Sequence, residues 1–326
     1  MTPNFKIHTY SEILFSVSNL HYWDNLFVNH LGWNKDFEDS VSPTNLDFWG
    51  IDNNMVSQEA VFSFQNLAFG KVRIIEYKGI YQEIIRSGGQ TWDVGGILDI
   101  DLRVSDINKA YQDFENLGWQ GYSPPAEAVM GPFTVQEVLM KGPDGIVFAL
   151  VHRSNPPHPN PYNLEGCTSN VYLSAMTVNN LAVATDFFVN KLGFKIHNSI
   201  NFKSPKPERT MFGLPHHLAD KTNIKLNIIG PEENRDGLLD LVELEGITGE
   251  NFVARCTYQN KGIIAYRFPV TNLENYYEYL KSQSVNFLIS PKTLQINGLG
   301  TSKMFSVQSP DGVILEFYES SIKNNF

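Results

Sequence analysis

One motif occurs twice in this chain with the same internal spacing. Residues 27–33 read FVNHLGW, and residues 188–194 read FVNKLGF. The segment GKVRIIEYKG at 70–79 is matched in the same way by GLLDLVELEG at 237–246. Motifs that recur in the same order along a chain indicate a fold built from one supersecondary unit that is used several times. The chain is therefore expected to consist of copies of a single module.

The clearest copy of this module covers residues 95–152. Residues 97–104 alternate apolar and charged side chains with a period of two, which predicts a strand with one apolar face. Residues 107–117 carry apolar side chains at helical spacing and are followed by a glycine, which predicts a short amphipathic helix. Further strands follow, and the last two are joined by a Pro-Asp-Gly turn at 143–145. The predicted order is β-α-β-β-β, and residues 262–319 repeat it with a second Pro-Asp-Gly turn.

The period of two also assigns side chains to the two faces of a strand. In residues 97–104, Ile100 and Leu102 are expected to face the helix. The opposite face then carries Asp99, Asp101 and Arg103. A single module leaves one apolar face uncovered, so modules are expected to pair. The charged face is expected to line the cavity between paired modules.

The modules share further details. Their first strands end in hydrophobic-x-Val-x-Asp/Asn, their helices stop at Leu-Gly-aromatic, and Pro-Asp-Gly precedes the last strand. Tandem β-α-β-β-β modules with these features resemble the vicinal oxygen chelate superfamily. That superfamily holds glyoxalase I, the extradiol dioxygenases, and the bleomycin and fosfomycin resistance proteins. The resemblance implies the fold more narrowly than the reaction, because one scaffold carries many chemistries.

The resemblance implies an α+β fold in which four modules form two half-open curved-sheet barrels with the helices outside. Residues 1–155 are expected to form an N-terminal barrel from modules 1 and 2. Residues 167–326 are expected to form a C-terminal barrel from modules 3 and 4. Residues 156–166 between them are rich in proline and are expected to form a stiff linker.

Metal ligands in the superfamily come from the start of the first strand and from the last strand of paired modules. Carried over to this chain, these positions predict Glu12, Glu76 and Asp99 as metal ligands in the N-terminal barrel. The first-strand positions of modules 3 and 4 are Leu173 and Ala265, so the C-terminal barrel is expected to support structure. The last-strand positions of those two modules are Glu243 and Glu316.

Three inward carboxylates raise one another's pKa unless a cation lies near them. A set of oxygen ligands suits Mg²⁺, Mn²⁺ or Ca²⁺ better than zinc or copper. If no metal is bound, Arg103 is the expected counter-charge. Glu12, Asp99 and Arg103 are therefore the predicted catalytic residues. The alternative interpretation is that these residues form structural ion pairs that close the barrel mouth.

Three functions follow from these hypotheses. The first is a glyoxalase-like lyase or isomerase that moves a proton on a small oxygenated organic substrate in the N-terminal barrel, with a cation or Arg103 polarising a carbonyl. The second is a metal-free protein that binds or sequesters a small molecule. The third, an extradiol-type dioxygenase, would need atypical ligands. Iron sites of that type use two histidines and a carboxylate, and none of the four first-strand positions is histidine.

Composition narrows the expected partners to a small molecule. The net charge of −10 and the pI near 5.3 disfavour nucleic acid and anionic membranes, because either partner needs a basic face. The two cysteines, Cys167 and Cys256, lie in different modules, so no disulfide framework is expected. No signal peptide and no run of about 18 apolar residues is visible. A cytoplasmic protein is expected, and a homodimer stays open.

Overall fold

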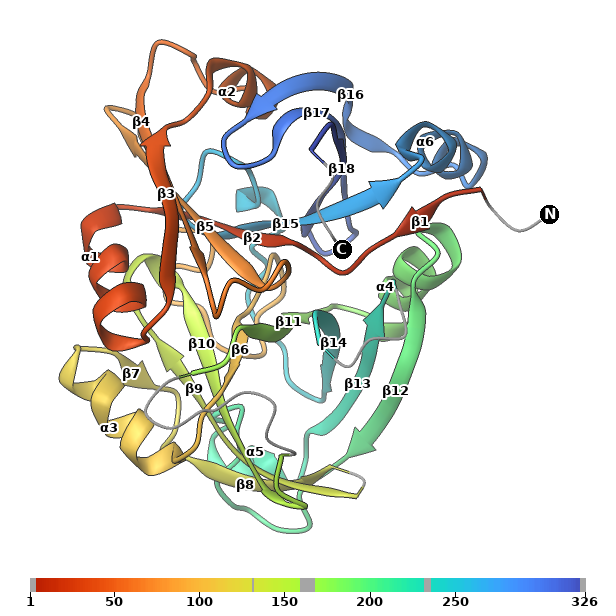
Figure 1. Ribbon diagram of the computed structural model, residues 1–326. Coiled ribbons are helices and arrows are strands. Elements are labelled where there is room, and N and C mark those ends of the chain that lie inside the picture. The colour runs from red at the N-terminus through yellow and green to blue at the C-terminus, as the bar shows by residue number, and fades with distance from the viewer. Residues whose placement is uncertain (1–3, 131, 159–167, 232–235, 323–326) are drawn as a thin grey trace.

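The computed structural model describes residues 4–130, 132–158, 168–231 and 236–322. Within these residues the chain forms two curved sheets of nine strands each, with the helices packed against them (Figure 1). Each of the four predicted modules is present as a strand, a helix and further strands. The predicted α+β class and the two half-open barrels are confirmed.

Module 1 follows the short strand β1 (Lys6–Ile7). It consists of β2 (Glu12–Val17), α1 (Leu20–Asn25), the π-helical turn η1 (Leu26–His30), β3 (Asn34–Ser40), β4 (Val56–Ser63) and β5 (Lys71–Lys78), with α2 (Pro43–Trp49) inserted between β3 and β4. Asn19 caps α1, because its side chain accepts a hydrogen bond from the backbone N–H of Tyr22.

Module 2 contains the predicted strand and helix of residues 95–152. It consists of β6 (Ile100–Arg103), α3 (Ile107–Asn116), β7 (Gln120–Gly121), β8 (Ala126–Met130), β9 (Phe133–Lys141), the 3-10 turn η2 (Pro143–Gly145) and β10 (Val147–Asn155). Asp106 caps α3 by accepting hydrogen bonds from the backbone N–H groups of Asn108 and Lys109.

Modules 3 and 4 repeat the same order of elements. Module 3 consists of β11 (Val171–Thr177), α4 (Leu181–Thr185), η3 (Asp186–Lys191), β12 (Lys195–Phe202), β13 (Asn223–Gly230) and β14 (Leu238–Glu245), with α5 (His216–Ala219) before β13. Module 4 consists of β15 (Gly262–Thr271), α6 (Leu273–Ser282), β16 (Phe287–Ile296), β17 (Gly300–Gln308) and β18 (Ile314–Ser320), and η4 (Val253–Arg255) precedes it.

The repeated FVN-x-LG motif forms the same local structure in modules 1 and 3. In both modules it produces a π-helical turn, η1 or η3, at the end of the helix. The glycine of each motif then adopts a positive φ, 71° at Gly32 and 84° at Gly193. Glycine has no Cβ and accepts this conformation without strain.

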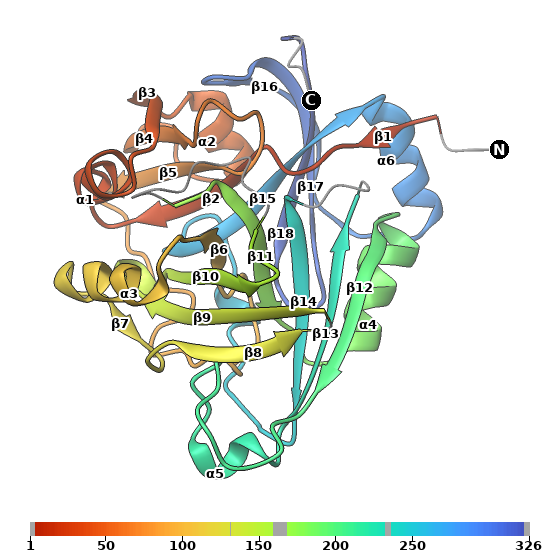
Figure 2. The ribbon, with the colours of Figure 1, turned by 60° about the horizontal axis from the view of Figure 1, so that its bottom comes forward.

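The modules pair differently from the expectation. One sheet has the strand order β16-β17-β18-β15-β2-β5-β4-β3 and combines module 4 with module 1. The other has the order β12-β13-β14-β11-β6-β10-β9-β7 and combines module 3 with module 2. We call them the 1/4 half-barrel and the 2/3 half-barrel. The predicted N-terminal barrel of residues 1–155 and C-terminal barrel of residues 167–326 are therefore wrong. Figures 1 and 2 show the red and blue strands together in one sheet and the yellow and green strands in the other.

Charge gives a physical reason for this pairing. The first strands of paired modules run antiparallel at the centre of each sheet, and Glu12 of β2 lies opposite Arg267 of β15. Pairing β2 with β6 in the same register would place Glu12 opposite Asp101. Like charges directly opposite each other destabilise a sheet. We expected module 1 to pair with module 2 because consecutive units tend to be neighbours. The long connections at 79–99 and 246–261 allow the chain to pair more distant modules instead.

These two connections run side by side. Parallel bridges join Ile84 to Lys261 and Val94 to Asn251. The buried guanidinium of Arg86 donates hydrogen bonds to the carbonyl oxygens of Gln90, Asp93 and Gly95 at 2.8 to 3.0 Å. The side chain of Arg86 therefore fixes the first connection from within.

The two faces of the strands follow the predicted assignment. Ile100 and Leu102 of β6 lie in the apolar core with Phe114 of α3. The charged side chains of the same segment, Asp99, Asp101 and Arg103, are buried on the opposite face, inside the half-barrel. Burying charged groups on the concave face needs compensation by partners or a raised pKa.

The predicted linker lies mostly outside the described residues, and the expected lack of membrane-spanning helices can be examined only for the described part of the chain. Most of the predicted linker, residues 159–166, and Cys167 lie outside the described residues, so the linker stays a prediction. Strand β10 continues to Asn155, next to the predicted start of the linker. In the part of the chain that the structure describes, no helix is long and apolar enough to cross a membrane.

Candidate functional site

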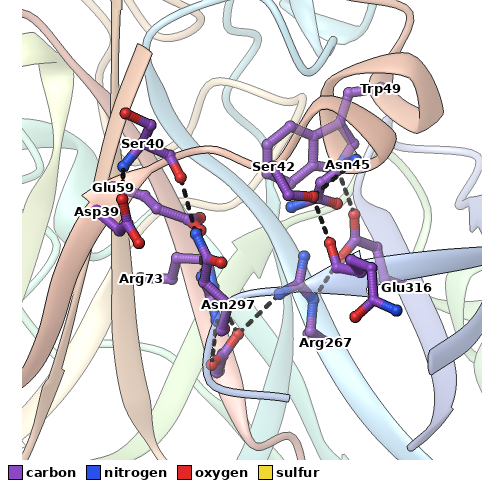
Figure 3. A network of polar contacts seen from close by, with 12 residues as sticks. Asp39, Ser40, Ser42, Asn45, Trp49, Glu59, Arg73, Arg267, Asn297 and Glu316 are labelled. Atoms are coloured by element: carbon purple, nitrogen blue, oxygen red, sulfur yellow. Dashed lines mark hydrogen bonds and ion pairs between the residues drawn. The ribbon is translucent and has the colours of Figure 1, made fainter. Parts of the chain in front are cut away.

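The 1/4 half-barrel encloses a chain of alternating acidic and basic side chains (Figure 3). Arg73 donates from Nε and Nη2 to the two oxygens of Glu12, at 2.8 and 2.9 Å, and from Nη1 to Glu59 at 2.8 Å. Arg267 donates from Nη1 to Glu12 at 2.9 Å and from Nε to Glu316 at 2.6 Å. All five side chains are buried. Glu12, predicted as a ligand and a catalytic group, is thus held by two arginines.

Neighbouring groups complete this network. Asn297 donates to Glu59 at 2.9 Å, and the indole N–H of Trp49 donates to Glu316 at 2.7 Å. The Trp49 ring belongs to α2 and stacks on Tyr258, with the ring centroids 5.7 Å apart. The central charges of the 1/4 half-barrel pair with one another, which fits the structural ion-pair interpretation of Glu12. The buried Nη2 of Arg267 has no hydrogen-bond partner among the described residues.

The 2/3 half-barrel carries a different set of charges on its inner face. The members of this carboxyl cluster are Asp99 before β6, Asp101 on β6, Glu137 on β9 and Asp240 on β14. Asp99 and Asp101 are buried, whereas Glu137 and Asp240 are half-buried. Asp99 accepts a hydrogen bond from the backbone N–H of Ala175 at 3.0 Å. One oxygen of Asp101 and one of Asp240 have no hydrogen-bond partner among the described residues.

The pKa values of the carboxyl cluster are raised. Burial raises the pKa of Asp99 to about 6, although hydrogen bonds from Ala175 and Asp101 favour its ionised form. Burial and then repulsion from Asp99 raise the pKa of Glu137 to about 8 and that of Asp240 to about 8. The same two causes hold the pKa of Asp101 well above its ordinary value. Carboxyl groups with such values both hold and release protons near neutral pH.

The arginines beside the cluster are engaged by other groups. Arg103, a predicted catalytic residue, donates from Nη1 to Asp236 at 3.2 Å and lies 3.8 Å above the ring of Tyr172. Arg86 holds the connection at 79–99, and its charge lowers the pKa of Asp99 by less than burial raises it. Among the described residues, the carboxyl cluster therefore has no ion pair of the kind that holds Glu12.

Apolar walls surround the cluster. The inner face also carries Leu139 of β9, Ala149 of β10, Ala175 of β11 and Val242 of β14. The half-buried rings of Tyr122 and Tyr172 pack against this apolar group. Apolar walls with a few convergent polar groups are typical of sites for small organic ligands.

Glu76 lies on the outer face of its sheet. Its Oε2 accepts a hydrogen bond from the backbone N–H of Leu20 at 2.8 Å, at the start of α1. Glu243 accepts in the same way from Leu181 at the start of α4, at 3.0 Å. A carboxylate there satisfies an N–H that the helix leaves free and interacts favourably with the helix dipole. The predicted placement of Glu76 in the cavity is wrong, and Arg73 occupies the inner-face position.

The three predicted metal ligands do not come together. Glu12 and Glu76 lie on opposite faces of the sheet of the 1/4 half-barrel, and Asp99 lies in the 2/3 half-barrel. The predicted grouping is therefore wrong. Asp99 and Arg103 do share one half-barrel, and their catalytic roles stay predictions.

Sequence reasoning missed Glu59, Arg73, Glu137 and Asp240. A signal for two of them was present, because the matched segments GKVRIIEYKG and GLLDLVELEG align Arg73 with Asp240. These residues lie at corresponding inner positions, opposite Leu14 of β2 and Ala175 of β11. Both strands carry apolar residues on both faces, so their sequences alone did not show which set faces the cavity.

The expected metal positions offer few ligands. The 1/4 half-barrel has Glu12, Arg73, Ala265 and Glu316 at these positions, and the 2/3 half-barrel has Asp99, Ala149, Leu173 and Asp240. In the described ranges no three His, Cys, Asp or Glu side chains are placed to hold a metal ion. As placed, these residues do not fit resident Mg²⁺, Mn²⁺ or Ca²⁺, nor the two-histidine, one-carboxylate set of a dioxygenase.

Comparisons with known proteins agree with this architecture. Residues 171–317 match the Glyoxalase/Bleomycin resistance protein/Dioxygenase superfamily. Glyoxalase I from Zea mays superposes with a TM-score of 0.62 at 14% identity, over 97% of this chain and 92% of that one. A putative dioxygenase from Bacillus subtilis subsp. subtilis str. 168 superposes with a TM-score of 0.58 at 10% identity, over 97% and 86%. No curated protein matches the chain in sequence.

The two half-barrels of paired β-α-β-β-β modules define a glyoxalase-like fold with four tandem modules. The match of residues 171–317 to the Glyoxalase/Bleomycin resistance protein/Dioxygenase superfamily agrees with the resemblance to the vicinal oxygen chelate superfamily seen in the sequence. The low identities show the fold and leave the reaction to be argued from the site.

The two half-barrels predict opposite pH dependences of stability. Burial alone would raise the pKa of Glu12, but Arg73 and Arg267 lower it from 4.5 to about 2, so its contribution is present above pH 4.5 and lost as the pH falls toward 2. Asp99, with its pKa raised to about 6, and Asp240, raised to about 8, contribute stability below their ordinary value of 3.8 that is lost as the pH rises through those values. Urea unfolding should show the greatest stability at mildly acidic pH and a decline toward pH 8. Asp240→Asn should flatten this decline, and an unchanged slope would contradict the assignment.

Proposed function

We propose that this chain is a glyoxalase-like enzyme of the lyase or isomerase type, and that it moves a proton on a small oxygenated organic substrate in the 2/3 half-barrel. The carboxyl cluster on apolar walls is the observation that carries the proposal. The pKa of Asp99 is raised to about 6, and those of Glu137 and Asp240 to about 8. Titratable groups whose environments separate their pKa values supply a base and an acid at one pH.

Asp99 is the general base in this proposal. At neutral pH its carboxylate is mostly ionised and removes a proton from a substrate carbon next to a carbonyl group. Glu137 is the general acid, because a carboxyl group with a pKa of about 8 keeps its proton at pH 7. The C–H electron pair shifts to form a C=C bond, the carbonyl oxygen accepts the proton of the acid, and an enol results. Where the carbon that lost its proton carries a hydroxyl group, this enol is an enediol. Protonation of the former carbonyl carbon by Asp99, with transfer of that hydroxyl proton to the carboxylate of the general acid, forms the new carbonyl group and completes an isomerisation.

A metal-free binding protein is the second candidate. The apolar walls of the 2/3 half-barrel and the absence, among described residues, of three converging metal ligands favour it. Under this alternative the carboxyl cluster orients a ligand and exchanges no proton with its carbon atoms.

Exchange of carbon-bound hydrogen separates the two candidates. Small 2-hydroxy and 2-oxo compounds are incubated with the protein in D₂O, and the loss of their C–H signals is followed by NMR. We expect catalysed exchange in at least one compound, and we expect Asp99→Asn to slow it by about 10²–10⁴-fold. Glu76→Gln on the outer face serves as the control and should leave the rate unchanged. Exchange that persists in Asp99→Asn would overturn the assigned base, and binding without exchange would favour the binding protein.

A further inference from the structure

The two half-barrels can be compared position by position through their strand pairing. Arg267 of β15 lies opposite Glu12 and next to Glu316 of β18. At the corresponding position the 2/3 half-barrel has Ala175, which lies beside Asp99 and opposite Asp240. One arginine of the 1/4 half-barrel is therefore replaced by alanine, while both neighbouring carboxyl groups are kept.

The second arginine shows the same replacement. Arg73 of β5 lies opposite Leu14 of β2, and the corresponding residue of β10 is Ala149, opposite Asp101. The adjacent strands keep their acid, because Glu59 lies opposite Ile75 of β5 and Glu137 lies opposite Val151 of β10. The 2/3 half-barrel thus retains all three carboxyl positions, adds a fourth carboxyl group, and lacks both guanidinium groups.

This exchange removes volume as well as charge. Arg73 and Arg267 fill the centre of the 1/4 half-barrel with two planar groups that bridge its three carboxylates. In the 2/3 half-barrel the residues at both positions are alanines, whose side chains are much smaller than arginine and carry no charge. Aspartate replaces glutamate at two of the three carboxyl positions, which shortens each of those side chains by one methylene group.

Two members of the carboxyl cluster have an oxygen without a partner, and two members are partly exposed. One oxygen of Asp101, a residue only 6% exposed, has no hydrogen-bond partner among the described residues, and the same holds for one oxygen of Asp240. Glu137 and Asp240 are half-buried, whereas the corresponding Glu59 and Glu316 are completely buried. Buried polar atoms are normally satisfied, so acceptors of this kind point to a donor that a ligand supplies.

We infer that the 2/3 half-barrel binds a small organic cation of the guanidinium or amidinium class, whose charged group takes the place that Arg267 has in the other half-barrel. The inference rests on the proposed function, because it names the substrate class of the same site. A planar cation with several N–H donors matches carboxylates in pairs, as Arg73 matches Glu12 with two hydrogen bonds. The ligand thereby supplies the positive charge that the cluster lacks.

Isothermal titration calorimetry with methylguanidinium tests this inference without any turnover. Methylurea has nearly the same shape and no charge, and serves as the matched control ligand. We expect methylguanidinium to bind at least about tenfold more tightly than methylurea at pH 8, and about tenfold more weakly at pH 6, where the cluster holds more protons. Because no catalytic step is measured, a failed exchange experiment and a failed binding experiment are distinguishable.

Two variants on one strand locate the binding. Asp240→Asn on the inner face of β14 should abolish the calorimetric signal. Glu243→Gln on the outer face of the same strand should preserve it, because Glu243 contacts the start of α4. Circular dichroism confirms that both variants are folded. Equal binding of methylurea, equal binding by Asp240→Asn, or binding of MgCl₂, MnCl₂ or CaCl₂ in place of methylguanidinium would each overturn the inference.

Discussion

Replacing Arg73 by Met is expected to lower the free energy of unfolding by about 3–5 kcal/mol. Methionine fills much of the space but removes the charge that holds both Glu12 and Glu59. The two carboxylates stay buried in the 1/4 half-barrel, and only Glu12 keeps a second arginine. A buried charge without its partner costs more than the ion pair contributed, because its desolvation is no longer compensated. Urea unfolding at pH 7 measures the loss.

A matched control lies on the same strand. Lys71 of β5 forms an ion pair with Asp36 at 2.7 Å, and both side chains are 24% exposed. Lys71→Met should cost at most about 1 kcal/mol, because water screens a pair near the surface. Adding Glu59→Gln to Arg73→Met should recover part of the lost stability. Similar small losses from both single variants would show that burial does not decide the energy of these pairs.

Ala175→Arg is expected to convert the 2/3 half-barrel into a copy of its neighbour. The new guanidinium would stand beside Asp99 and Asp240 as Arg267 stands beside Glu12 and Glu316. The pKa values of both aspartates should fall, and stability at pH 8 should rise by about 1–3 kcal/mol. Binding of methylguanidinium should be lost, because the arginine occupies its place. Urea unfolding at pH 6 and pH 8 and calorimetry at pH 8 measure these effects.

Ala175→Met separates charge from bulk. Methionine adds length at the same position without a positive charge, so it should weaken ligand binding but leave the decline of stability toward pH 8 in place. If Ala175→Met flattens the pH dependence as much as Ala175→Arg, then the raised pKa values do not arise from missing positive charge. The comparison of Arg73 with Ala149 and of Arg267 with Ala175 would then lose its physical basis.

The module was predictable because local signals agreed with one another. Alternation around Asp99 and Asp101, helical spacing at 107–117 and the repeated FVN-x-LG motif each indicate one element, and the structure has each of them. The pairing of modules was not predictable from these signals, because it depends on contacts between residues far apart in sequence. Glu12 and Arg267 are 255 positions apart. Their opposite charges can be recognised as an ion pair only when the pairing of the strands is known.

The sequence predicted that the candidate site carries buried carboxyl groups, but it did not predict all the residues that form the site. Alternation correctly placed Asp99 and Asp101 inside a half-barrel, where their charges need compensation. The last strands β5 and β14 are apolar on both faces. Their sequences therefore did not show that Arg73 and Asp240 face the cavity, whereas Glu76 and Glu243 face outward. Hydrogen bonds to the helix starts show which face each residue lies on, because Glu76 and Glu243 cap helices and cannot also face the cavity.

The pairing of the first module with the fourth also has a consequence for synthesis on the ribosome. Glu12 is translated 255 residues before Arg267. At about 5–20 residues per second this interval lasts roughly 13–50 s. Throughout it β2 has an unpaired edge, which is a template for pairing with other chains. Modules 2 and 3 are adjacent in sequence, so their half-barrel can form while module 1 still lacks its partner, module 4. The nascent chain is therefore expected to pass through a stage in which its first module needs protection from aggregation until the last module emerges.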